Sequence, residues 1–206
     1  YGHIPALFLF YKKDPGIKGL EPGDSSSSLD GKLVSDAVTI VPLLGNEKSA
    51  EMLVEMASAI NTRSSVQAVN ITEVPNQTFL EALNKDTPKV LSIERRLKRL
   101  SKIQKLKIDF ESAVTHEVSN TIAELSGQTN CDWLVMGWDG RAHSGILVRN
   151  PVGWLLANVQ SNFALFKDNG IKNISKIVIA LRPGRKDRNF LAVSERVASF
   201  YGASLT

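Results

Sequence analysis

The chain has 206 residues, of which 43% are hydrophobic and 22% are charged, and its formal net charge at pH 7 is +4. These values are ordinary for a soluble globular protein and leave enough apolar residues to build a core. A single cysteine, Cys131, excludes an internal disulfide and a metal site built from cysteines. The mild positive charge favours anionic surfaces but identifies no partner.

Residues 1–13 contain an apolar stretch, residues 4–11, which is followed by Lys12 and Lys13. A stretch of this length is too short to cross a bilayer, which needs about 20 residues. It is therefore either the end of a transmembrane helix that begins upstream, with the lysines on the cytoplasmic side, or a short buried segment. Residues 14–36 are dense in Gly, Pro, Ser and Asp, a composition that predicts a linker.

Residues 37–168 alternate between strand-like and helix-like patterns. Strands are expected at 37–44, 65–74, 108–115, 131–138 and 162–168, and helices at about 48–61, 88–107, 116–129 and 151–160. Strands and helices thus follow one another in strict alternation. This order predicts an α/β fold with a five-stranded parallel sheet and helices on both faces.

The chain after the fifth strand begins the same pattern again. SKIVIAL (175–181) is similar to AVTIVPLL (37–44), and SERVASFYG (194–202) is similar to the helical VEMASAIN (54–61). We interpret residues 175–206 as the first strand and helix of a second, truncated copy of the unit.

Residues 88–107 have the pattern of a basic amphipathic helix, with apolar residues every three or four positions. The stretch 85–107 carries nine Lys or Arg against two acidic residues. A solvated helix face explains this pattern, and the second interpretation is contact of residues 94–107 with anionic lipid headgroups or an acidic partner. Nucleic acid is not expected as a partner, because no aromatic residues are interleaved for base stacking.

Three features of the chain resemble the universal stress protein family. They are the strand TIVPLLGNEKS (39–49) that leads directly into a helix, the long region before IDFESAVT (108–115), and DWLVMGWDG (132–140) leading into a glycine loop. The resemblance covers about residues 36–168, with 175–206 as the start of another copy. It implies a five-stranded parallel sheet between helices. In the nucleotide-binding branch of the family it also implies a phosphate loop of the form G-x2-G-x9-G-[S/T].

Gly137 and Gly140 match the first half of that loop, but Asn150 and Pro151 stand where Gly and Ser or Thr are expected. The glycines permit close backbone approach to an anion at the start of a helix. Asn150 can cap that helix, whereas Pro151 contributes no N–H, and Arg149 can add positive charge. The resemblance therefore implies a degenerate nucleotide loop with Gly137, Gly140, Arg149 and Asn150 as its binding residues.

The other half of the family's nucleotide pocket is an Asp after the first strand. Here the matching run ends at Leu44, and the second copy has Leu181 or Arg182 at the equivalent place. A leucine cannot hydrogen-bond ribose or adenine. With two departures at separate contact points, we expect no bound cofactor, and ATP or another adenine nucleotide remains the alternative.

No catalytic or metal-binding constellation is visible in the sequence. His116 begins an H-E sequence, but Asn120 stands where the second histidine of H-E-x-x-H is required. Cys131 precedes a buried strand, which is typical of a packed thiol. We therefore expect no enzymatic activity and no metal.

The apolar stub, the linker and the tandem units together resemble the cytosolic C-terminal region of transporters in the amino acid–polyamine–cation superfamily. This group includes cation–chloride cotransporters and cationic amino acid permeases. The resemblance implies a cytoplasmic regulatory or assembly domain of an integral membrane protein. Such a domain forms a homodimer, contacts the membrane domain of the same polypeptide, and acts by binding. The alternative is a soluble universal stress protein-like protein that binds ATP or another nucleotide.

Overall fold

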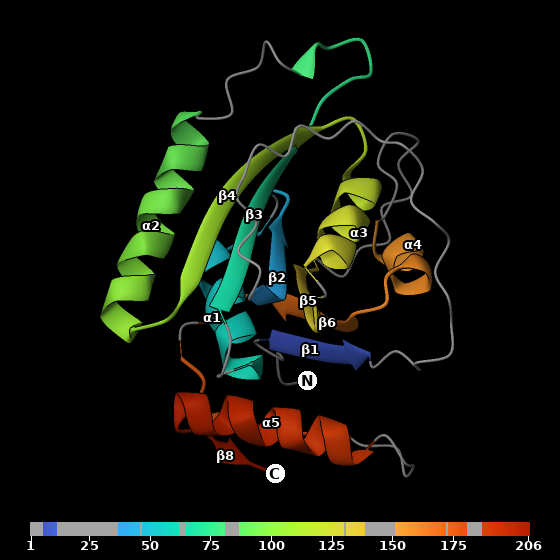
Figure 1. The fold of residues 1–206 in the computed structure, drawn as a ribbon. Coiled ribbons are helices and arrows are strands. Elements are labelled where there is room, and N and C mark those ends of the chain that lie inside the picture. The colour runs from blue at the N-terminus through green and yellow to red at the C-terminus, as the bar shows by residue number, and fades with distance from the viewer. Residues whose placement is uncertain are drawn as a thin grey trace.

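Five parallel strands form the centre of the fold in the computed structural model (Figure 1). The structure describes residues 6–11, 37–45, 47–61, 65–80, 87–129, 131–138, 151–171, 173–180 and 187–206. The parallel strands are β2 (Ala37–Leu43), β3 (Ser65–Glu73), β4 (Ile108–Thr115), β5 (Trp133–Gly137) and β6 (Asn162–Asp168). With an additional strand, β1, they form one six-stranded sheet in the order β1-β6-β5-β2-β3-β4.

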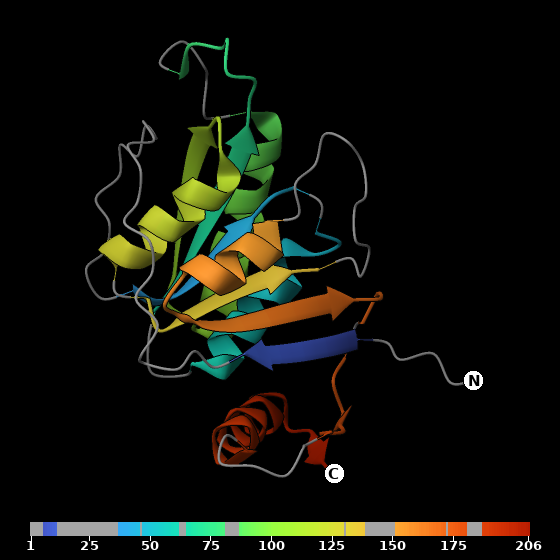
Figure 2. The same ribbon diagram turned by 90° about the vertical axis from the view of Figure 1, so that its right-hand side faces the viewer.

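Helices cover both faces of this sheet, as Figure 2 shows. The helices are α1 (Ala50–Ile60), α2 (Pro88–Gln104), α3 (Val118–Gln128) and α4 (Pro151–Asn158). One core cluster joins the sheet to α1 and α2, and a second cluster joins it to α3 and α4. The predicted fold class, a five-stranded parallel sheet with helices on both faces, is confirmed.

The strand residues fill both layers because successive side chains of a strand point to opposite faces. In β2, Val41 and Leu43 belong to the cluster with α1, whereas Ile40 belongs to the cluster with α3 and α4. All three are fully buried. A central parallel strand therefore needs a continuous apolar run, and AVTIVPL provides one.

The helix boundaries follow from local signals. Ser49 caps α1 by accepting a hydrogen bond from the Met52 N–H at 3.1 Å. Thr87 caps α2 in the same way, through the Val90 N–H at 3.3 Å. The helix predicted to run to residue 107 ends at Gln104, because Lys105 takes a left-handed φ of 55° and so terminates it.

Residues 6–11 form a strand, β1 (Ala6–Tyr11), and not the end of a helix. β1 pairs antiparallel with β6, with Phe8 opposite Phe166. This differs from the helical interpretation of residues 1–13. Leucine and aromatic residues suit an extended chain on a sheet edge, and β1 finds its partner in a distant strand. Among the described residues, none of the helices has the length and hydrophobicity that a membrane span requires.

The C-terminal residues form a second, smaller sheet. Its two strands, β7 (Lys176–Ile177) and β8 (Ser204–Leu205), are parallel and are joined by α5 (Asp187–Tyr201). Strand, helix and parallel strand is also the order in which β2, α1 and β3 follow one another. The interpretation of residues 175–206 as the start of a second copy remains a prediction. The structure adds a further strand, β8, to the predicted strand and helix.

Candidate functional site

The candidate site lies between β2 and β5, where the order in which strands are added to the sheet reverses. From β2 the chain passes through α1 to β3 on one side, and only later returns to place β5 on the other side of β2. In open α/β sheets, ligands bind at the carboxyl ends of the strands at such a switch point. Gly137 is the last residue of β5 and lies at this edge. The other predicted binding residues, Gly140, Arg149 and Asn150, lie outside the described residues.

A carboxylate of the chain itself occupies the end of β2. Glu47 accepts a hydrogen bond from the Leu44 N–H through one oxygen, at 2.5 Å, and from the Gly45 N–H through the other, at 2.9 Å. Gly45 has a φ of +81°, a backbone conformation that favours glycine and turns the two N–H groups towards one side chain. Successive backbone N–H groups of this kind form an anion-binding concavity. In this chain, the side chain of Glu47 takes the place of the anion.

Gly137 contacts this carboxylate residue from β5. A Cβ atom added at Gly137 would lie 3.2 Å from Glu47 Cγ and 3.6 Å from Leu53 Cδ2. The absence of a side chain at Gly137 therefore allows Glu47 and Leu53 to approach the β5 backbone closely. The sequence assigned Gly137 to a nucleotide loop. In the described part of the chain, Gly137 instead makes room for Glu47 and Leu53.

A cation from α2 lies on the other side of the turn. Lys89 Nζ donates a hydrogen bond to the Gly45 carbonyl at 3.4 Å, and a Cβ at Gly45 would meet Lys89 Nζ at 2.9 Å. The turn at the end of β2 thus brings together two N–H donors and a carboxylate, and the Lys89 ammonium group of α2 reaches it from outside. Its polar groups are already satisfied by residues of the same chain.

Leu44 lies beside this turn, at the position where the family resemblance implies an Asp. Its side chain is partly buried and packs against the cluster under α3 and α4. An apolar contact of this kind leaves no oxygen for a ribose hydroxyl. Leu44 therefore acts as a packing residue at the edge of the candidate site.

Sequence reasoning missed Glu47 and Lys89. The acidic residue four positions after the end of β2 was a usable signal, because a side chain at that distance can reach the N–H groups that the strand leaves unpaired. Lys89 had no such signal. It lies 44 residues from Gly45 in sequence and reaches the turn only because α2 packs next to α1.

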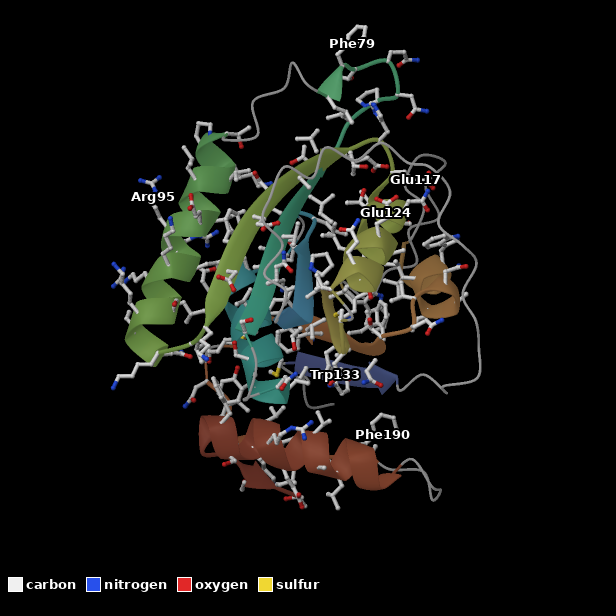
Figure 3. All side chains as sticks on the ribbon, in the orientation of Figure 1. Phe79, Arg95, Glu117, Glu124, Trp133 and Phe190 are labelled. Carbon is white, nitrogen blue, oxygen red and sulfur yellow. The ribbon has the colours of Figure 1, made fainter. Side chains whose placement is uncertain are left out.

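The other residues singled out in the sequence have structural partners. His116 Nδ1 lies 3.2 Å from the Val74 carbonyl oxygen. The Cys131 thiol donates to the carbonyl of Trp133, the β5 residue labelled in Figure 3, at 2.8 Å. Burial raises the pKa of Cys131 to about 11, so the thiol is protonated at neutral pH. Among the described residues, no three His, Cys, Asp or Glu side chains gather in a metal-binding group.

Comparison with known proteins gives a likeness of fold. No family model and no curated protein sequence matches the chain. A universal stress protein solved in complex with cAMP is 16% identical, with a TM-score of 0.46, over 63% of this chain and 96% of that one. A universal stress protein from Archaeoglobus fulgidus is 14% identical, with a TM-score of 0.43, over 64% and 98%. A third, from Lactobacillus plantarum, is 13% identical, with a TM-score of 0.35, over 63% and 97%.

Proposed function

We propose that this chain is a cytoplasmic regulatory and assembly domain of a membrane transporter for amino acids or for cations and chloride. It acts by binding to other domains and to a second copy of itself, and not by catalysis. The observation that carries this proposal is the internal satisfaction of the switch-point site. The two N–H groups at the end of β2 donate to the Glu47 carboxylate, so an external phosphate would have to displace a side chain of the same chain.

Contact between α1 and α5 supports an assembly role. α5 occupies the same place in its strand–helix–strand unit as α1 does in the first unit, and the two helices pack together through Ile60, Val193 and Val197. Arg196 Nε also donates to the Ile60 carbonyl at 2.8 Å, which satisfies a carbonyl at the end of α1. The helices of the two strand–helix–strand segments therefore pack on each other within one chain.

The α1–α5 contact also buries a phenol. Burial raises the pKa of Tyr201, and the nearby carboxylate of Glu55 on α1 raises it further, so Tyr201 is protonated throughout the physiological range. An uncharged tyrosine is compatible with an apolar docking surface. The contact thus resembles a domain interface in its chemistry.

The experiment that tests the site is thermal unfolding of the 206-residue chain in millimolar ATP. A ligand that binds the native state must raise its Tm, so we expect no ATP-dependent rise. A saturable rise in Tm would support the alternative, a soluble nucleotide-binding protein. Sedimentation equilibrium tests the homodimer separately, and a monomer at all concentrations would contradict the assembly role.

The attachment to a transporter has its own test. The linker 14–36 followed by an α/β unit supports it, because this order resembles that of the C-terminal regions of such transporters. The coding sequence upstream of Tyr1 should contain several apolar runs of about 20 residues each. A start codon directly before Tyr1 would contradict the attachment.

A further inference from the structure

The solvent side of α2 carries a row of charged and apolar side chains. Leu91, Arg95, Arg99 and Ile103 are each separated by four residues and therefore lie along one side of the helix. Lys98 and Lys102 lie beside this row. We refer to these six residues as the basic face of α2. All six are exposed, and Val90, Ile93 and Leu97 form the buried side of the helix.

Among the described residues, only one cation of the basic face has a carboxylate partner. Lys98 pairs with Glu94 at 2.6 Å, and Arg96, outside the basic face, pairs with Glu51 at 3.0 Å. In the part of the chain that the structure describes, no carboxylate pairs with Arg95, Arg99 or Lys102. Arg95 Nε donates instead to the Leu91 carbonyl of its own helix, at 3.2 Å.

This arrangement does not stabilise the helix. Arg95 and Arg99 are separated by four residues, as are Lys98 and Lys102, and like charges at that spacing destabilise a helix slightly. A solvated face would be served better by alternating signs. The two like-charged pairs therefore point to a use outside the fold.

The position of α2 leaves this face accessible. α2 lies at the margin of the molecule beyond β4, and its inner side packs against α1 and β4 (Figure 1). The Arg95 side chain lies on the side of α2 that points away from the sheet, as Figure 3 shows. From Leu91 to Ile103 the face is about 18 Å long, which is enough to contact several lipid headgroups at once.

We propose that the basic face of α2 lies on an anionic membrane surface. The guanidinium and ammonium groups contact lipid phosphates, and Leu91 and Ile103 enter the headgroup region at the two ends of the row. This inference rests on the proposed function, which places the chain next to a membrane. It adds the surface by which the domain meets that membrane.

The exposed apolar residues favour a membrane over an acidic protein or nucleic acid. Leu91 is 39% exposed and Ile103 is 67% exposed, although both belong to a charged helix face. Helices that lie in the membrane interface combine basic residues, which contact the headgroups, with apolar side chains that enter the headgroup boundary, and the exposed side of α2 offers both. α2 carries no aromatic residue for base stacking, and charge alone would suffice for an acidic peptide.

The test measures sedimentation of the 206-residue chain with vesicles of phosphatidylcholine, with and without phosphatidylserine. We expect binding to the vesicles that contain phosphatidylserine, which weakens as NaCl is added because salt screens the headgroup charge. Equal binding to both vesicles would overturn the proposal, as would binding to neither. Binding to polyglutamate without binding to vesicles would also overturn it, in favour of an acidic protein partner.

Two matched variants locate the surface. Arg95→Gln/Arg99→Gln removes two charges from the basic face and should weaken binding by roughly tenfold or more. Lys48→Gln/Lys176→Gln removes two exposed charges elsewhere and should leave the binding within about twofold of the parent chain. Equal losses in both variants would show a dependence on net charge alone and would overturn the assignment to α2.

Leu91 and Ile103, at the two ends of the basic face, allow the apolar part of vesicle binding to be tested separately from charge. Leu91→Gln/Ile103→Gln keeps every charge and should still lower vesicle binding several-fold, because the helix then has no apolar contact with the headgroup region. Binding identical to that of the parent chain would overturn the insertion of these side chains. The proposed function is tested by thermal unfolding with ATP and by sedimentation equilibrium of the chain alone. Neither measurement involves vesicles, so the two proposals can fail independently.

Discussion

The end of β2 and the basic face of α2 treat charge in opposite ways. At the end of β2, the Glu47 carboxylate accepts hydrogen bonds from two backbone N–H groups, and Gly137 lies next to its side chain. On α2, Arg95 and Arg99 stand next to each other without a carboxylate among the described residues. The first region satisfies its polar groups within the chain, whereas in the second region three of the four cations have no carboxylate in the described part of the chain. From the sequence, the glycine spacing indicated a degenerate nucleotide loop after residues 131–138, and the basic helix was compatible with a solvated face or with a contact to anionic lipid.

The largest expected difference between the two regions is in packing. Leu53 is fully buried beneath Gly137, whereas Leu91 is exposed on the basic face. Leu53→Ala should lower the free energy of unfolding by about 3 kcal/mol, because it removes buried methyl groups and leaves a cavity. Leu91→Ala should change it by about 0.5 kcal/mol or less. Urea denaturation measures both, and equal losses would show that the two leucines are not distinguished by burial.

The second expected effect concerns the carboxylate at the end of β2. Glu47→Ala leaves the Leu44 and Gly45 N–H groups without their acceptor, and we expect a loss of about 1 kcal/mol because water can partly replace it. Glu94→Ala, which removes the exposed pair with Lys98, should cost about 0.3 kcal/mol. A smaller loss for Glu47 than for Glu94 in urea denaturation would contradict this account of the turn.

The same variant should also convert the end of β2 into a site open to external anions. Inorganic phosphate, compared with chloride at equal ionic strength, should raise the Tm of Glu47→Ala more than that of the parent chain, because phosphate can then reach the two N–H groups. Identical responses to phosphate would show that Glu47 does not occupy an anion position.

A glycine comparison sharpens the geometry at the site. Gly137→Ala places a Cβ 3.2 Å from Glu47 Cγ and should cost roughly 1 kcal/mol by overpacking. The cost should shrink in the Glu47→Ala background, where that contact is absent, so a double-mutant cycle isolates it. Gly127 lies in α3 with no atom within 4 Å of an added Cβ. Gly127→Ala should therefore raise stability by about 0.5–1 kcal/mol. A gain at Gly137 would contradict the close approach.

The fold could be predicted because its signal is local and repeated. Apolar runs such as AVTIVPL, followed by helix patterns with Ser49 and Thr87 as caps, fix the alternation of strands and helices. The pairing of β1 with β6 could not be predicted in this way. Phe8 lies opposite Phe166, and a contact across that length of chain leaves no trace in the local pattern of either strand.

At the candidate site, the sequence could place Gly137 at the end of a strand, but it could not identify Glu47 as the acceptor of the turn. Gly137 is at the switch-point edge, as its position after an apolar run implies. The occupation of the N–H groups by Glu47 depends on the positive φ of Gly45, which the sequence permits but does not require. On α2 the charges were visible in the sequence. Their partners were not, because Glu51 meets Arg96 only after α1 and α2 have packed together.

The smallest expected effect is on the stability of the basic face itself. Arg95→Gln/Arg99→Gln removes a like-charged pair four residues apart and keeps a similar helix propensity, so the free energy of unfolding should rise by about 0.3 kcal/mol. Guanidinium chloride would mask this difference by screening, and urea at low salt is therefore the suitable denaturant. A loss above about 1 kcal/mol would mean that these arginines hold the fold together. A small gain, together with weaker vesicle binding, would mean that the chain keeps them at the expense of stability for contact with a membrane.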